Sequence, residues 1–369
     1  MSKKQWIGGV VVLAALIALA VWARHRIHFD FAEFRVQIAL ADWRKIVLGL
    51  ACIYAGYVIR SARWALLLRH NKKVSPLSLV GTQVMGFTAV ALIGRVADLV
   101  RPYLVARKTK LELSSQIAVY IVERLFDAGA MALVFSTALL EVSQTDVLTA
   151  IRQTGHMTLL LNRSPELAAS ALRYGGLVLT VLGALFLVGI RLNGETIAQF
   201  FERAFSLISK KLAHAVGQKI RTFHTGLDTI RSFGELAAVG SLSVIMWALI
   251  AAAYFETMRA FTASQPLSTI TVGKAVLLML ISGGASIFQL PVFGWFSQIG
   301  IVAWALTVVT GAGHEAAVAC AACLLLVTFL GIVPVGLLWA QFENVNLRAV
   351  TRESEHTAEE MAEDAPGGA

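Results

Sequence analysis

Charged residues are scarce in this sequence. Only 15% of its 369 residues are Asp, Glu, Lys or Arg, whereas 57% are hydrophobic and the mean hydropathy is +0.70. A soluble domain of ordinary composition carries about 25% charged residues, because its surface must be hydrated. The shortage excludes such a domain and indicates that much of the chain faces lipid.

Cysteines and catalytic signatures are also scarce. The chain has three cysteines, Cys52, Cys320 and Cys323, and all lie in apolar segments. Cys320 and Cys323 have metal-ligand spacing, but the second pair that a zinc site needs is missing, so we interpret them as small core residues. His314-Glu315 begins a zinc-protease signature that lacks its second histidine, and no Walker-type phosphate loop occurs. The sequence therefore predicts neither an enzyme nor a bound cofactor or metal.

Long apolar runs are what the sequence has in abundance. A helix needs about 20 apolar residues to cross a bilayer, because each backbone polar group must find its partner within the helix. The sequence predicts an all-α fold, a polytopic transmembrane helix bundle with about six full spans. These spans are expected at about residues 5–23, 44–66, 115–140, 171–191, 236–258 and 316–341. The first resembles a secretory signal ending at Ala18-Leu19-Ala20, but its apolar run continues to Arg24, which favours a retained helix.

Two further apolar stretches, residues 76–94 and 271–310, are interrupted by glycine and proline. We expect re-entrant or broken helical segments there. Irregular backbone at membrane depth persists only where protein or a wet cavity satisfies it, so both segments are candidates for the functional centre. If they enter from opposite faces, the arrangement is typical of an inverted repeat, although no repeat is visible in the residues themselves.

The net charge is +9, and the Lys and Arg residues lie between the apolar runs. No nucleic-acid-binding motif accompanies them, so we attribute them to the positive-inside rule and expect no nucleic-acid partner. The predicted location is a bacterial-type cytoplasmic (inner) membrane, with both termini in the cytoplasm. We expect a transmembrane domain over residues 1–345 and a disordered acidic tail over 346–369. Within the domain, the basic loop 191–235 is expected to be cytoplasmic, with a helix lying on the membrane surface or packed on the bundle.

The most informative charged stretch contains Arg95, Asp98 and Arg101. In a helix these residues share one face, so the carboxylate can pair with either guanidinium. Pro102 is expected to end or kink that helix. Ionisable groups inside a membrane are costly and persist where they pair or line a path.

A second cluster, Glu123 and Asp127, lies four residues apart near the start of a long apolar helix. The two carboxylates repel unless a cation lies between them, and we expect Arg95 and Arg101 to supply it. The functional interpretation is a pocket in which arginines hold a phosphate and carboxylates orient them. The alternative is a set of interfacial charges that set topology and lock helices together.

Arg60, Arg63 and Trp64 follow another apolar run. We interpret them as a positive flank with an aromatic anchor at the membrane interface, rather than as part of a site.

At these residues the sequence resembles the lysylphosphatidylglycerol synthase transmembrane-region family, also called flippase-like membrane proteins. The resemblance is carried by Gly94-Arg95-x-x-Asp98-x-x-Arg101-Pro102-Tyr103 and Glu123-Arg124-Leu125-Phe126-Asp127, then by Gln289-Leu290-Pro291-x-x-Gly294-x-x-x-Gln298 and His314-Glu315. It extends over roughly residues 40–340. Asp98 stands where the family usually has Glu, and Gly94 where it usually has Pro.

The resemblance implies a protein that binds and flips an anionic lipid, either a phospholipid or a polyprenyl-phosphate-linked one. The aminoacyl-transferase activity of the full synthases is not expected in this chain. The residues that the resemblance assigns to lipid or substrate binding are Arg95, Asp98, Arg101, Tyr103, Glu123, Arg124, Asp127, Gln289, Pro291, Gln298 and Glu315.

Two other functions stay open. An ion- or proton-coupled transporter of a small solute would use Asp98, Glu123 and Asp127 as proton carriers, and a non-catalytic membrane scaffold would need no pocket at all. A homo-oligomer or a separate lipid-modifying enzyme stays open as a protein partner.

Overall fold

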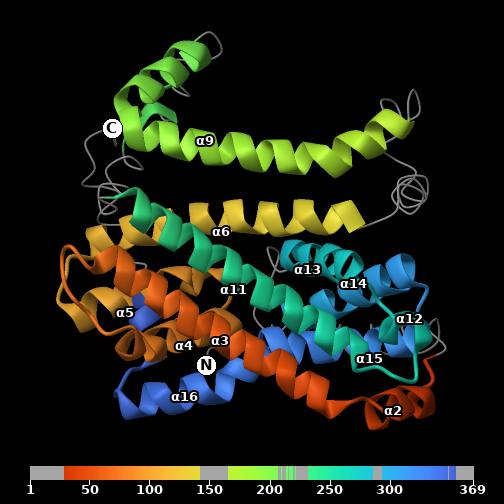
Figure 1. The fold of residues 1–369 in the computed structure, drawn as a ribbon. Coiled ribbons are helices and arrows are strands. Elements are labelled where there is room, and N and C mark those ends of the chain that lie inside the picture. The colour runs from red at the N-terminus through yellow and green to blue at the C-terminus, as the bar shows by residue number, and fades with distance from the viewer. Residues whose placement is uncertain are drawn as a thin grey trace, which may run out of the picture.

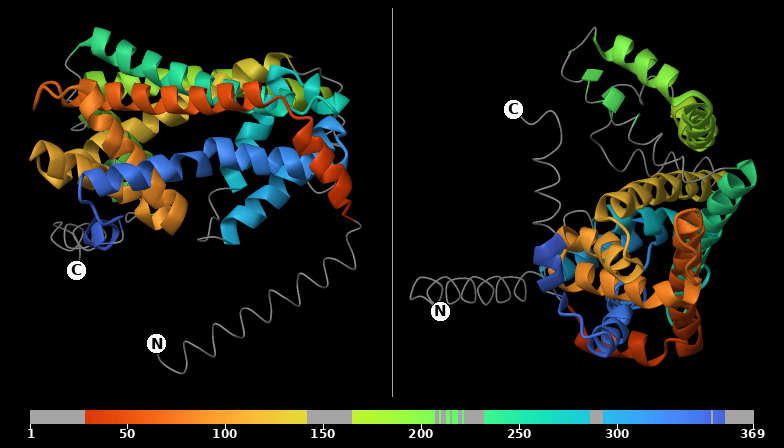
Figure 2. Two further views of the ribbon diagram at one scale, coloured as in Figure 1. Left: turned by 90° about the horizontal axis from the view of Figure 1, so that it is seen from below. Right: turned by 90° about the vertical axis from the view of Figure 1, so that its left-hand side faces the viewer.

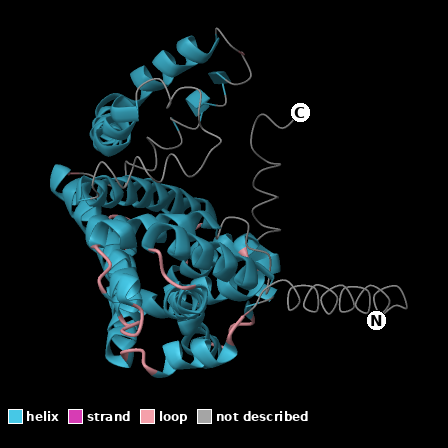
Figure 3. Cartoon of the chain, turned by 90° about the vertical axis from the view of Figure 1, so that its right-hand side faces the viewer, coloured by secondary structure: helices cyan, strands magenta, loops and turns pink. Residues whose placement is uncertain are grey.

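The computed structural model describes residues 29–141, 165–206, 232–285, 293–347 and 349–354, together with short pieces between 209 and 221. Every regular element in these parts is helical (Figure 3). The elements are α2 (Phe31–Ala39), α3 (Trp43–Leu68), α4 (Pro76–Ile93), the 3-10 helix η1 (Arg95–Leu99), α5 (Val100–Thr109), α6 (Leu113–Glu141), α9 (Pro165–Ser206), α11 (Phe233–Arg259), α12 (Gln265–Ser268), α13 (Val272–Ala285), α14 (Phe293–Thr310), α15 (His314–Thr328), the 3-10 helix η3 (Leu330–Ile332) and α16 (Val333–Phe342).

By length and composition, α3, α4 and α11 can each cross a membrane, and the bent α15–α16 pair adds a fourth span if it is counted as one. The predicted helices 44–66 and 236–258 correspond to α3 and α11. The helix predicted at 115–140 is α6, and the one predicted at 171–191 is part of the longer α9. The helix predicted at 5–23 lies outside the described residues.

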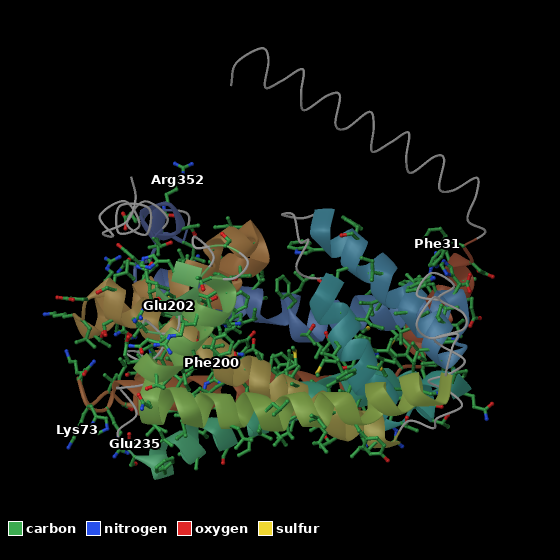
Figure 4. All side chains as sticks on the ribbon, turned by 90° about the horizontal axis from the view of Figure 1, so that it is seen from above. Phe31, Lys73, Phe200, Glu202, Glu235 and Arg352 are labelled. Carbon is green, nitrogen blue, oxygen red and sulfur yellow. The ribbon has the colours of Figure 1, made fainter. Side chains whose placement is uncertain are left out.

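One end of the bundle, which we call the basic end, is held together by ion pairs. Arg69, after α3, pairs with Glu235 of α11 at 2.7 Å. Lys108 of α5 pairs with Glu343, after α16, at 2.7 Å. Figure 4 shows Lys73 and Glu235 at this end. The basic segments that follow α3 and end α5 therefore lie on the same side of the protein.

The opposite end is joined by backbone contacts. The backbone N–H of Asp42 donates to the Ala260 carbonyl at 2.8 Å, which joins the start of α3 to the end of α11. The backbone N–H of Asp30 is 3.4 Å from Glu315 Oε1 at the start of α15. Phe31 marks this end in Figure 4. These contacts and those of the basic end fix the direction of each long helix.

The segment α4–η1–α5 forms a hairpin that starts and finishes at the basic end. Lys72, just before α4, donates through Nζ to the Thr109 carbonyl at the end of α5, at 2.7 Å. Of the two alternatives expected for residues 76–94, the hairpin is the one present, because α4 is not broken internally. The chain turns at Gly94, whose φ of 99° suits glycine and few other residues. Pro102 lies in the first turn of α5 and does not end it, because a proline there removes no helical hydrogen bond.

The second hairpin, α13–α14, starts and finishes at the opposite end, since it follows α11 and precedes α15. Residues 286–292, between the two helices, lie outside the described residues. The interruption predicted within 271–310 therefore falls between two short apolar helices.

The two halves of the bundle repeat one order of elements in opposite directions (Figure 1). Residues 43–141 form a long helix towards the basic end, a hairpin, and a long helix back. Residues 233–342 form a long helix away from the basic end, a hairpin, and the α15–α16 pair back. This is the inverted arrangement that the two interrupted segments suggested.

The prediction of a continuous helix at 316–341 is wrong in one respect, because the helix is broken. α15 and α16 meet at an angle of 41° across η3. Pro334 lies in the first turn of α16. Since proline has no N–H and collides with the carbonyl four residues earlier, the preceding helix cannot run through it.

α9 forms an outer layer beside α6 (Figures 1 and 2). Its φ and ψ angles leave the helical region at Asn193, and it then continues to Ser206. A helix in the predicted basic loop 191–235 is thus present. Residues 349–354 are helical too, and Leu347 and Val350 are buried against α4 and α5. The prediction of a disordered tail over 346–369 is therefore wrong for this helical segment. Residues 355–369 lie outside the described residues.

Candidate functional site

Arginines of α3 and carboxylates of α6 form a buried ionic network. Arg60 Nη1 donates to Glu123 Oε1 at 2.8 Å and to Asp127 Oδ2 at 3.1 Å. Arg63 donates through Nη2 to Glu123 Oε1 and through Nη1 to Asp127 Oδ1, both at 2.6 Å. The two arginines are three residues apart and the two carboxylates four apart, so each pair occupies one face of its helix.

The interpretation of Arg60 and Arg63 as a membrane-interface flank is therefore wrong. Arg63 is fully buried, and its Nη1 also donates to Ser243 Oγ of α11 at 2.6 Å. Trp64 is no interfacial anchor either, because it is 1% exposed and donates through Nε1 to Gln116 Oε1 at 3.1 Å. Packing of α6 and α11 over this face of α3 buries groups that the α3 sequence alone places at an end.

Arg101, at the start of α5, reaches the same network from the first hairpin. Its Nη1 donates to Gln83 Oε1 at 3.1 Å and lies 3.4 Å from Glu123 Oε2. Its guanidinium lies over the rings of Phe87, at 4.6 Å, and Tyr120, at 5.0 Å. The predicted pairing of Arg101 with the second cluster is confirmed for Glu123, although Arg60 and Arg63 make the shorter contacts.

Close packing against α4 holds Arg101 in this position. A Cβ atom added at Gly86 would overlap the Arg101 side chain at Cγ, so only glycine leaves room for it. Arg95 lies in η1, and its side chain is outside the described part of the structure. Within the described structure the hydrogen bonds of Arg101 go to Gln83 and Glu123, so of the two pairings predicted as open to Asp98 the one with Arg101 is not formed.

Arg124 is the most accessible guanidinium of the network. Its side chain is 37% exposed, lies 4.0 Å from Asp127 Oδ2 and rests over the Tyr120 ring at 4.9 Å. Its Nε and Nη2 atoms have no hydrogen-bond partner within the described structure. We call the following six residues the arginine cluster: Arg60, Arg63, Arg101, Arg124, Glu123 and Asp127. Four guanidiniums face two carboxylates, which leaves an excess of positive charge.

A cavity of about 210 Å³ adjoins the arginine cluster at Arg60 and Arg124. The first hairpin contributes Asp98 and the second contributes Ser282, so both hairpins reach the cavity from opposite ends of the protein. Most of the remaining wall is apolar, and the break between α15 and α16 closes part of it. The predicted residue Gln298 also lines the cavity.

Two predicted site residues lie away from the cavity. The Tyr103 hydroxyl donates to Glu353 at 2.7 Å near the basic end. Glu315 lies at the other end, beside the Asp30 backbone. Both residues were assigned from motifs that are local in the sequence, whereas the cavity is lined by residues from helices that lie far apart in the sequence. Gln289 and Pro291 fall outside the described residues.

These features define an integral, multi-pass membrane protein with an internal cavity between two opposed helical hairpins. Residues 6–336 match the family described as the lysylphosphatidylglycerol synthase TM region, and the chain belongs to that family. Neither a curated protein nor a solved structure matches the chain.

Proposed function

We propose that this protein binds the anionic head group of a membrane lipid in the cavity and moves that lipid between leaflets. The observation that carries the proposal is the position of the cavity. It lies between two hairpins that enter from opposite ends, and the arginine cluster forms part of its wall. A site at this depth can be reached from either side when one hairpin moves relative to the bundle.

The chemistry of the arginine cluster supports an anionic ligand. Arg124 lines the cavity, and a guanidinium binds phosphate through two parallel hydrogen bonds. Glu123 and Asp127 hold Arg60 and Arg63 in place from behind. The apolar remainder of the wall suits acyl or polyprenyl chains that stay in the lipid phase.

The same contacts argue against a proton-coupled solute transporter. Glu123 accepts hydrogen bonds from three arginines, and each oxygen of Asp127 accepts one from Arg60 or Arg63. Protonating either carboxylate would break strong charge-assisted hydrogen bonds, which is a poor arrangement for a carrier that loads and releases protons.

We further propose six crossings, formed by residues 5–23, α3, α6, the part of α9 before Asn193, α11 and the α15–α16 pair, with the two hairpins inserted between them. The basic end would face the cytoplasm of a bacterial-type inner membrane, following the positive-inside rule, and both termini would lie there. We propose no enzymatic activity. The partner is a phospholipid or a polyprenyl-phosphate-linked lipid, and a second copy of the chain or a lipid-modifying enzyme is a candidate protein partner.

Native mass spectrometry of protein purified in mild detergent tests this function. We expect a retained phospholipid or polyprenyl phosphate in the wild type, and about a 10- to 100-fold weaker affinity in Arg124→Gln, because a hydrogen bond to a charged group is lost. Arg107→Gln is the matched control, since Arg107 is exposed on α5 and does not line the cavity. Equal lipid retention in all three proteins, or none in the wild type, would contradict the proposal.

A further inference from the structure

A short helix that follows α16 packs on the first hairpin with one of its faces. Four of its residues are buried, namely Leu347, Val350, Thr351 and Ser354. Their spacing of three, four and seven residues from Leu347 places them on the same side of the helix. Arg352 lies on the exposed side and is seen at the edge of the bundle in Figure 4. We call residues 346, 347 and 349–354 the C-terminal strap.

The buried face of the strap joins an apolar cluster that the two halves of the bundle share. Besides Leu347 and Val350, this cluster contains Met85 and Val90 of α4, Val100 and Leu104 of α5, and Ala340 of α16. The first hairpin belongs to one half of the bundle and α16 to the other. Separating the hairpin from the strap would return apolar surface to water, which is unfavourable. The strap therefore holds the first hairpin to the second half.

Polar contacts fasten the strap and the end of α16 to α5. The Tyr103 hydroxyl donates to Glu353 Oε2 of the strap at 2.7 Å. Lys108 Nζ donates to Glu343 Oε1 at 2.7 Å, and Trp339 Nε1 donates to the same oxygen at 3.2 Å. For α5 to move away from α16, these contacts must break. Tyr103, which the sequence motif assigned to the ligand, thus has a different partner in the structure.

The apolar cluster beneath the strap is also part of the cavity wall. Val90 lines the cavity, and so does Phe329, which precedes the break between α15 and α16 and packs against the cluster. Asp98 brings the tip of the same hairpin to the cavity. A displacement of the first hairpin from α16 would therefore open this wall and pull the strap from its seat in one movement.

We propose that the C-terminal strap locks the first hairpin against α16 and keeps the cavity closed towards the basic end until the strap detaches. This inference rests on the proposed function, because it concerns the entry of the ligand into the same cavity. The strap follows α16 and is held by one apolar face and by the contact of Glu353 with Tyr103. A terminal segment of this kind can open locally while the bundle stays folded. The strap is thus an autoinhibitory element.

Thiol labelling measures access to the cavity and requires no lipid transport. In a background whose three native cysteines are replaced by alanine, Val90→Cys reports on the cavity. Val119→Cys reports on general loosening, because Val119 is similarly buried on α6 and does not line the cavity. The probe is a charged, water-soluble methanethiosulfonate, added to the protein in mild detergent.

The variant that detaches the strap is Leu347→Ser combined with Val350→Ser. We expect it to accelerate labelling of Val90→Cys about tenfold or more, because two apolar side chains no longer hold the strap in its seat. Labelling of Val119→Cys should not change. Ala349→Ser combined with Arg352→Ser is the matched control, since it places two serines on the exposed side of the same helix and should alter neither rate.

Tyr103→Phe provides a second variant if the double exchange does not fold. It deletes the hydroxyl that binds Glu353 and keeps the ring. Because one hydrogen bond at the protein surface is lost and the apolar face of the strap is unchanged, labelling of Val90→Cys should accelerate by a smaller factor, about two- to fivefold.

The outcomes separate the two proposals. Unchanged labelling of Val90→Cys in both strap variants overturns this inference. Equal acceleration at Val119→Cys overturns it too, because the strap would then support the whole bundle rather than close the cavity. If labelling accelerates at Val90→Cys alone and no phosphate lipid binds to the protein, the strap is confirmed and the proposed function fails.

Discussion

Replacing Glu123 by glutamine should destabilise the helix bundle by about 3–5 kcal/mol, the cost of removing one partner from a buried ion pair. Glu123 is 1% exposed and accepts from Arg60 at 2.8 Å and Arg63 at 2.6 Å. Glutamine preserves the shape of the side chain but removes its charge, and its amide group directs N–H donors at guanidinium donors. Asp127 would then be the sole carboxylate of the arginine cluster.

The free energy of unfolding can be measured in mild detergent by adding SDS and following the fluorescence of the eight tryptophans. A double-mutant cycle sharpens the test. Because Arg63→Gln removes a guanidinium that loses one of its two carboxylate partners in Glu123→Gln, the double variant should be more stable than the sum of the two single changes predicts, with a coupling free energy of roughly 2–3 kcal/mol. Glu112→Gln, an exchange near the start of α6, is the control and should change stability by less than about 0.5 kcal/mol. Additive effects, or a Glu123→Gln variant within 1 kcal/mol of wild type, would refute the reasoning.

Two further outcomes are expected. Gly86→Ala should cost about 1–3 kcal/mol of unfolding free energy, because the added methyl group overlaps Arg101, whereas Gly129→Ala meets nothing within 4 Å and should cost far less by the same measurement. Beyond the membrane-embedded part, Arg221 donates to Glu202 at 2.6 Å and lowers the pKa of that carboxyl below its usual 4.5. The stabilisation is therefore complete above pH 4.5 and lost as the pH falls through the lowered value. Hydrogen exchange of residues 194–206 should accelerate in acid, and Glu202→Gln should reduce that dependence, since Glu195 still pairs with Arg221. A rate insensitive to pH in the wild type after correction for intrinsic exchange would contradict it.

Much of the fold could be predicted from local pattern. The apolar runs that became α3 and α11 have charged residues at their ends, so their limits were predicted to within three residues. The break between α15 and α16 has a local cause in Pro334, and the sequence interpretation overlooked it. The kink at Asn193 also has a local signal, the Asn193-Gly194 dipeptide, which is typical of turns.

The site was harder to predict, because its burial depends on contacts between distant segments. The pattern around Arg60 and Arg63 favours an interfacial flank, since an arginine after an apolar run commonly faces head groups. Their burial is caused by α6, about 60 residues further along the chain. The signal in the sequence that could have predicted this contact is the spacing of the charged residues. The two arginines are three residues apart and Glu123 and Asp127 are four apart, so each pair lies on one face of its helix and the two faces can pair.

The ionic contact between α3 and α6 has a consequence for how the protein enters the membrane as it is synthesised. An unpaired charge costs up to roughly 2.5–3.5 kcal/mol on insertion, the value at the helix centre, so each helix is more favourable in lipid when the other is present. Arg60 and Glu123 are 63 positions apart. At ~5–20 residues per second, the ribosome needs ~3–13 s to make the partner helix. We therefore expect α3 to be held at the insertion machinery until α6 emerges, so that the two helices and the first hairpin are released into the bilayer together.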